Sequence, residues 1–191
     1  MKTTLPPIIT KDFFETRCRK KGIVLDTNIL NLYIIGCAKH GKLEKDTPLV
    51  EKYSEKDFKL LEALVKISKN SNSLYISPQT IPETLFELGV EPRRKKKTSR
   101  QIPAEKINNL FEYTIAILKE SNEDIYHPTP EIINIMGEEP IKMYGVPDLS
   151  FIPGIKSREY AFLSDDPALV AYMYSQDICA ITWKDFKQNY N

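Results

Sequence analysis

The sequence predicts an α/β fold in which helices cover a central parallel sheet. Short apolar runs at 22–25, 74–76 and 178–181 alternate along the chain with longer segments of helical periodicity. Strands that alternate with helices in this way are typical of parallel sheets. The runs are continuously apolar, which indicates strands that are buried on both faces.

Length and composition fit one globular domain. The 191 residues are 41% hydrophobic and 28% charged, and the formal net charge of +1 excludes a globally basic nucleic-acid binder. The cysteines Cys18, Cys37 and Cys179 form no CxxC motif, so a disulfide framework or a zinc site is not expected, and a reducing, cytoplasmic setting is. No stretch approaches the roughly 18 apolar residues of a membrane span, so no membrane association is expected.

The first half of the chain begins with an expected extension, residues 1–21, in which residues 9–20 form a short helix outside the core. The elements expected next are a strand at 22–25, a helix at 28–36, a polar loop at 39–53, a helix at 54–68 capped by Ser54, a strand at 74–76 and a helix at 80–88 that Gly89 ends.

The second half is expected to begin with the basic run and a helix that Pro103 opens. The further elements are a helix at 103–121, a short strand at 125–126, a short helix at 130–136, an irregular loop at 137–160 rich in proline and glycine, a helix at 166–174, a strand at 178–181 and a terminal helix at 183–190.

Three acidic residues lie where a predicted strand gives way to a helix. They are Asp26, Glu83 and Asp166. In open α/β sheets, functional groups gather beyond the carboxyl ends of the strands, so these side chains could converge. Converging carboxylates repel one another, and unpaired burial is costly. A divalent cation such as Mg²⁺ or Mn²⁺ resolves that conflict, because both prefer oxygen ligands.

Each acid also has a purely structural interpretation. Asp26 or Asn28 could cap the first core helix, Glu83 could complete a capping box with Thr80, and Asp166 before Pro167 is a good N-cap. The occurrence of all three at strand-to-helix junctions favours a shared site.

Three segments carry a resemblance to a known family. IVLDTNIL is similar to the opening strand and first acid of the PIN-domain nucleases, ISPQTIPETLFEL resembles their second motif, and FLSDDPALVAYMYSQDICAITWKDF resembles their third acid, its helix and the final strand. In the family pattern the third acid precedes an alanine by five positions, which matches Asp166 and Ala171. The resemblance covers roughly residues 22–188 of a domain at 22–191, with insertions near 40–53, 91–101 and 140–160.

The resemblance implies a three-layer α/β/α sandwich and Mg²⁺- or Mn²⁺-dependent endoribonuclease activity. Asp26, Glu83 and Asp166 would be the catalytic metal ligands, with Thr27, Asn28 and Asp165 around them. Members that are VapC-like toxins pair with an antitoxin protein and often form homodimers. RNA, single-stranded or structured, is the implied substrate.

The chain departs from the family pattern at the final strand. Family members often carry a fourth acid two residues after its threonine, where this chain has Lys184 after Thr182. Asp185, one place further on, is expected to act as a weak or outer ligand, and Asp165 to face solvent or cap its helix. The alternative function is a degenerate PIN domain that binds RNA or a protein without cutting.

A basic run lies between the predicted helices at 80–88 and 103–121. It could contact phosphate in RNA, or it could be a solvated surface loop; its residues are Arg93, Arg94, Lys95, Lys96, Lys97 and Arg100. Other enzyme classes fit less well. A haloacid-dehalogenase-type phosphatase would need an aspartate where Asn28 stands, and no glycine-rich loop follows the first strand as a P-loop or dinucleotide enzyme requires.

Overall fold

The sheet is the organising feature of the computed structural model, which describes residues 9–43, 50–70, 74–76, 80–87, 112, 114–117, 122–123 and 152–188. It has five strands in the order β3-β2-β1-β4-β5, and all neighbouring strands pair in parallel. The strands are β1 (Ile23–Leu25), β2 (Leu74–Ile76), β3 (Asn122–Glu123), β4 (Ala161–Ser164) and β5 (Ala180–Thr182). The predicted α/β class with a parallel sheet is confirmed.

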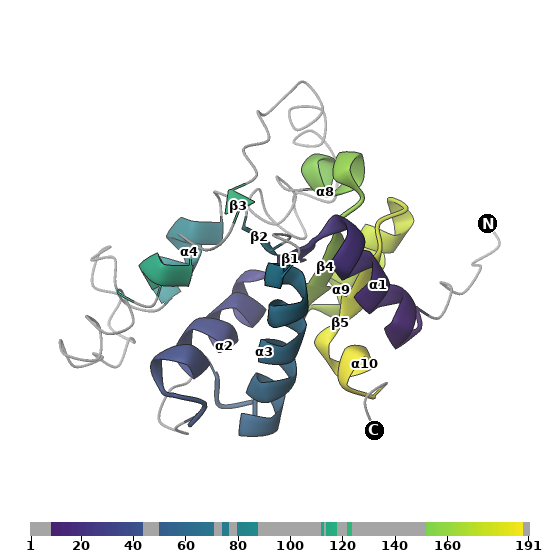
Figure 1. Ribbon diagram of the computed structural model, residues 1–191. Coiled ribbons are helices and arrows are strands. Elements are labelled where there is room, and N and C mark those ends of the chain that lie inside the picture. Colours follow the sequence, from purple (N-terminus) through teal and green to yellow (C-terminus); the bar gives the residue numbers. More distant parts are fainter. Residues whose placement is uncertain are drawn as a thin grey trace.

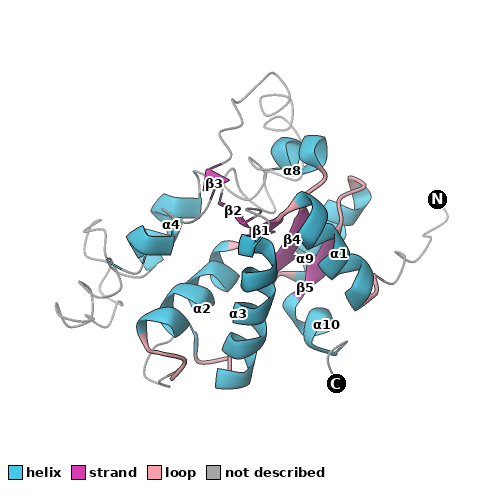
Figure 2. Ribbon diagram, in the orientation of Figure 1, coloured by secondary structure: helices cyan, strands magenta, loops and turns pink. Residues whose placement is uncertain are grey.

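Helices alternate with these strands along the chain (Figures 1 and 2). They are α1 (Lys11–Lys21), α2 (Thr27–Ala38), α3 (Glu55–Asn70), α4 (Thr80–Glu87), α8 (Ile152–Arg158), α9 (Pro167–Ser175) and α10 (Trp183–Gln188). No helix among the described residues is both long and apolar enough to cross a membrane.

Successive side chains of the central strand enter two different cores. Ile23 and Leu25 of β1 pack in one cluster with side chains from α1, α2, α3 and α10, whereas Val24 packs in a second cluster with side chains from α8 and α9. This alternation follows from the two-residue period of a strand. Both faces of the sheet are therefore covered by helices, an arrangement compatible with a three-layer fold.

The first helix belongs to the core, so the expectation that it lies outside the core was wrong. Phe14 and Cys18 of α1 are fully buried in the first cluster. The ring of Phe14 meets that of Phe186 from α10 edge-on, with centroids 5.6 Å apart. Spacing of four residues places Phe14 and Cys18 on one face of α1, which supplies the apolar surface that docks the helix.

One correction concerns the second half of the chain. Residues 152–158, within the segment expected to be an irregular loop, form α8. Pro153 is compatible with this helix because it lies in the first turn, where an N–H has no intrahelical partner. β3 lies at Asn122–Glu123, and the strand expected at 125–126 and the helix expected at 130–136 lie outside the described part of the chain. Of the helix expected at 103–121, residues 112 and 114–117 are described, and they are helical.

A capping box opens α3, as Ser54 predicts. The Ser54 N–H donates to Asp57 Oδ2 (2.7 Å), and the Asp57 N–H donates in return to Ser54 Oγ (3.2 Å). Lys187 Nζ of α10 lies 2.8 Å from Asp57 Oδ1, which joins the last helix to the start of α3. Burial acts to raise the pKa of Asp57, but the bonds from Lys187 and Ser54 outweigh it and lower the pKa overall.

Asp57→Ala is expected to lower the free energy of unfolding by about 1–2 kcal/mol at neutral pH, because it removes half of a capping box and the Lys187 contact. A carboxylate with a depressed folded pKa stabilises the protein above its unfolded pKa, and this contribution is lost as pH falls through the folded value. Urea unfolding near pH 7 and near pH 3 should show the difference between the two proteins shrinking in acid. Glu62→Ala, which removes a surface pair with Lys66, should cost less than about 0.5 kcal/mol.

Candidate metal-binding site

Asp26 lies at the carboxyl end of the central strand and caps α2. Its Oδ1 accepts a hydrogen bond from the Thr27 N–H (2.8 Å), and its Oδ2 accepts one from Ser164 Oγ (2.6 Å). Ser164 is the last residue of β4, the strand paired with β1. Asp26 is only 7% exposed. The end of the sheet therefore holds a buried carboxylate with two neutral donors.

Ser164 links Asp26 to the third predicted acid. The Asp166 N–H donates to Ser164 Oγ (2.9 Å), while Asp166 Oδ1 accepts from the N–H groups of Ala168 (2.7 Å) and Leu169 (3.1 Å). Asp166 is thus the N-cap of α9 and is also held one serine away from Asp26. The capping interpretation is confirmed for both aspartates, and it is compatible with a shared site.

Two matched hydrogen bonds join α2 to α4. Thr27 Oγ1 donates to Glu83 Oε2 (2.7 Å), and Asn31 Nδ2 donates to Glu87 Oε2 (2.5 Å). Each pair is separated by 56 residues, and the second pair follows the first by four residues on both helices. Residues four apart share a helix face. Glu83 is therefore held beside Asp26 through Thr27, the residue that Asp26 itself caps.

The carboxylates of this group act on one another electrostatically. Burial raises the pKa of Asp26 above its ordinary value, Ser164 and Thr27 oppose that rise, and the charges of Glu83 and Asp166 add to it. Burial likewise raises the pKa of Glu87, and Glu83 and Asp26 add to that rise, whereas the hydrogen bond from Asn31 and the charge of Lys52 oppose it. Within the described residues, the ion pairs involve other acids and leave this group without a paired cation.

Asp26→Asn is expected to stabilise the metal-free protein, and to do so more strongly as pH rises. The folded protein keeps a proton on Asp26 at pH values where the unfolded chain has lost it. The wild-type protein therefore loses stability as pH rises from the ordinary value of 3.8 through the raised folded pKa. Melting temperatures in EDTA near pH 4 and near pH 7 check this. An equal difference at both pH values would contradict it.

Asp165 does not face solvent or cap α9, so that expectation was wrong. Its Oδ2 accepts a hydrogen bond from the Tyr53 hydroxyl (3.0 Å) and pairs with Lys52 Nζ. Asp166 takes the capping position instead, which turns Asp165 toward the segment before α3. Lys52 also lies 5.2 Å from the centre of the Tyr53 ring.

Asp185 serves as half of a capping box at the start of α10. Thr182 Oγ1 donates to Asp185 Oδ2 (2.6 Å), and the Asp185 N–H donates to Thr182 Oγ1 (3.0 Å). Its carboxylate is exposed. Asn28 lies half-buried in the first turn of α2. The basic run at 93–100 lies outside the described residues.

Three residues of this group were missed by sequence reasoning: Ser164, Asn31 and Glu87. Ser164 directly precedes Asp165 and Asp166, and its position as a polar residue at the end of a strand could have indicated it. Asn31 and Glu87 follow Thr27 and Glu83 by four residues, and that helical repeat could have indicated them.

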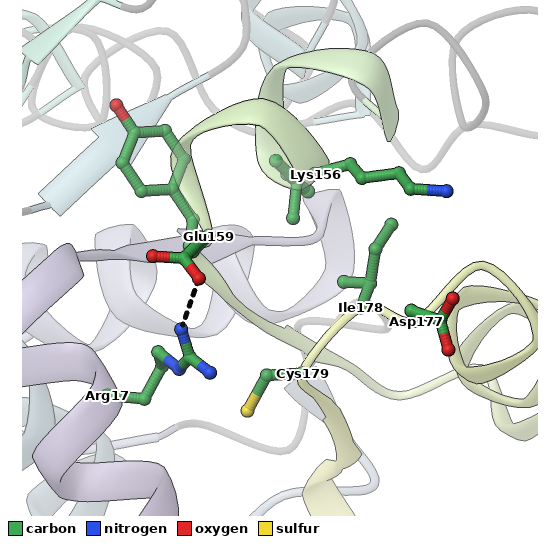
Figure 3. Close-up of a pocket in the computed structure, with 8 residues that line it drawn as sticks. Arg17, Lys156, Glu159, Asp177, Ile178 and Cys179 are labelled. Carbon is green, nitrogen blue, oxygen red and sulfur yellow. Dashed lines mark ion pairs between the residues drawn. The ribbon is translucent and has the colours of Figure 1, made fainter.

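A separate pocket of about 130 Å³ lies near the amino ends of β4 and β5 (Figure 3). Tyr160 and Cys179, which line it, come just before β4 and β5, whereas Asp26 comes just after β1. Arg17 of α1 lines it too and pairs with Glu159 (3.5 Å). This pocket is not part of the carboxylate group.

The oxygen atoms of the carboxylate group are of the kind that bind a hard divalent cation, although they are not arranged as a complete ligand shell. Among the described residues, no cluster of three or more histidine, cysteine, aspartate or glutamate side chains is arranged to hold a metal ion. The carboxylates instead accept hydrogen bonds from Thr27, Ser164 and Asn31. Carboxylate and amide oxygens are the ligands that Mg²⁺ and Mn²⁺ prefer, and a buried carboxylate without a counterion favours a cation.

Comparison with known proteins finds no match for this chain among family models, curated proteins or solved structures. The comparisons therefore neither support nor oppose the resemblance to the PIN-domain family. The geometry of the carboxylate group carries the functional inference.

Proposed function

We propose that this protein is a PIN-like, divalent-metal-dependent ribonuclease with a three-layer α/β/α fold that hydrolyses RNA phosphodiester bonds. One observation carries the proposal. Asp26 is buried at the carboxyl end of a parallel sheet, joined through Ser164 to Asp166 and through Thr27 to Glu83. Acids that are far apart in sequence are thus brought to one place, and their mutual repulsion favours a bound cation.

Asp26, Glu83 and Asp166 are the residues that would hold Mg²⁺ or Mn²⁺. A bound cation supplies a more nucleophilic water and neutralises charge that develops on the phosphate. The protein contributes the position of the ligands. The N-terminus of α9 beside Asp166 adds a partial positive charge at the place where a phosphate would approach.

The proposal includes RNA contact by the basic run. Changing Arg93, Arg94, Lys95, Lys96 and Lys97 to serine is expected to weaken RNA binding and to flatten its salt dependence, because each phosphate contact releases counterions. Binding should be measured at several salt concentrations in EDTA, and the melting temperature should change little. An unaltered slope of log affinity against log salt would assign the run to a solvated loop.

A VapC-like toxin with an antitoxin partner, or a homodimer, is the biological setting that the proposal favours. Mass measurement of the purified protein tests the dimer, and cleavage-dependent growth arrest on expression tests the toxin role.

The second candidate is a degenerate domain that binds RNA or protein without cutting. It is favoured by the hydrogen bonds that occupy the carboxylates and by the capping role of Asp185. Incubation with structured and single-stranded RNAs in Mg²⁺, Mn²⁺ or EDTA separates the two. We expect cleavage in metal and none in EDTA. RNA binding without cleavage in any metal would favour the degenerate domain.

A further inference from the structure

One buried acceptor beside the carboxylate group has no hydrogen-bond partner. Asn31 of α2 is 1% exposed, and its Oδ1 is an unpaired buried atom in the part of the chain that the structure describes. A buried polar atom without a partner costs about 1–3 kcal/mol. The other atom of the same amide, Nδ2, donates to Glu87 Oε2. The unpaired oxygen therefore lies directly beside a carboxylate.

Glu87 belongs to the same neighbourhood as the predicted acids. It follows Glu83 by four residues, so both side chains leave one face of α4, and that face meets the face of α2 that carries Thr27 and Asn31. Glu87 is half-buried and close enough to Glu83 and Asp26 to experience the charge of both. Glu87 thus adds a further carboxylate to the group that contains Asp26 and Glu83.

We propose that Glu87 is the carboxylate that completes the cation site, and that Asn31 positions it and offers its unpaired amide oxygen to the same cation. The inference rests on the proposed function. In this assignment Glu87 takes the place that was expected for Asp185, whose carboxylate is engaged by Thr182 in the cap of α10. Carboxylate oxygens together with an amide oxygen are ligands that suit a hard cation that keeps several waters.

Calorimetric titration of the metal-free protein with Mn²⁺ tests this assignment. Glu87→Gln removes the charge but keeps an oxygen that can accept from Asn31 Nδ2, so the contact between α2 and α4 is retained. We expect it to weaken Mn²⁺ binding by about 10–100-fold, the range seen when groups around a metal are changed. Glu62→Gln, on the exposed face of α3, is the matched control and should bind Mn²⁺ as the wild type does.

A second variant tests the role of the amide oxygen. Asn31→Leu has a similar volume and removes both the unpaired acceptor and the donor to Glu87, so its melting temperature in EDTA is measured first as the metal-free reference. The variant should lose most of the rise in melting temperature that Mn²⁺ gives the wild type, because that rise depends on affinity. Circular dichroism spectra confirm that each variant is folded before titration.

The outcomes separate this inference from the proposed function. Wild-type affinity in Glu87→Gln, or a tenfold loss confined to Asp185→Asn, would overturn the assignment of Glu87 and leave the nuclease proposal standing. No Mn²⁺ binding by the wild-type protein would overturn both. Weaker binding in Glu87→Gln and Asn31→Leu, with normal binding in Glu62→Gln, supports the assignment.

Discussion

Asp26→Asn is expected to reduce metal-dependent RNA cleavage by at least about 100-fold while the protein stays folded. Catalytic metal ions in general contribute several kcal/mol of charge stabilisation in the transition state, and each 1.36 kcal/mol is about tenfold in rate. Asn retains an oxygen that can accept from the Thr27 N–H, so the cap of α2 survives. Cleavage of one RNA in Mn²⁺, beside a melting curve, measures both effects.

The matched control is Asp12→Asn in the exposed first turn of α1, which removes the same charge from a residue outside the carboxylate group. It should cleave at the wild-type rate. If Asp26→Asn cleaves as fast as this control, Asp26 holds no catalytic cation and serves only as a helix cap.

Phe14→Ala is expected to cost about 3–5 kcal/mol of unfolding free energy, the range for truncating a fully buried aromatic residue. Phe14 is 0% exposed and packs edge-on against Phe186, so the change leaves a cavity between α1 and α10. The neighbouring residue supplies the control, because Phe13 is 50% exposed and Phe13→Ala should change stability by about 0.5 kcal/mol or less.

Urea unfolding of the two variants measures the difference directly. A similar cost for both, or a small cost for Phe14→Ala, would show that α1 is a dispensable extension. A large cost confined to Phe14→Ala would show that the domain core includes this helix.

The sequence predicted β1 and β2 well because these strands are apolar on both faces. β1 and β2 fall within the predicted runs 22–25 and 74–76, and α2, α3 and α4 fall where helical periodicity indicated them. Local patterns determine such elements. Whether an element docks on the core is a tertiary property, so the burial of α1 through Phe14 and Cys18 was not predicted.

The helix at 152–158 was missed because proline and glycine dominated the local pattern. Pro153 and Gly154 are turn formers in isolation. Burial of Ile152 and Ile155 against the second core stabilises the helix despite them. Tertiary packing outweighs weak local propensity at this place.

The sequence indicated the acids of the carboxylate group but not the contacts that join them. Junction position alone indicated Asp26, Glu83 and Asp166. The bond from Ser164 to Asp26 spans 138 residues, and no local pattern encodes such a contact. The roles of the adjacent aspartates depended on which one caps α9, and the structure assigns the cap to Asp166 and the contact with Tyr53 to Asp165.

Anomalous diffraction from crystals soaked in Mn²⁺ tests the central claim most directly, because it locates the cation whether or not RNA is cut. We predict a Mn²⁺ peak at the carboxyl ends of β1 and β4, within ligand distance of Asp26, and its absence from crystals of Asp26→Asn. Well-occupied Mn²⁺ found only at exposed acids elsewhere, with none beside Asp26, would contradict a metal-dependent active site in this protein.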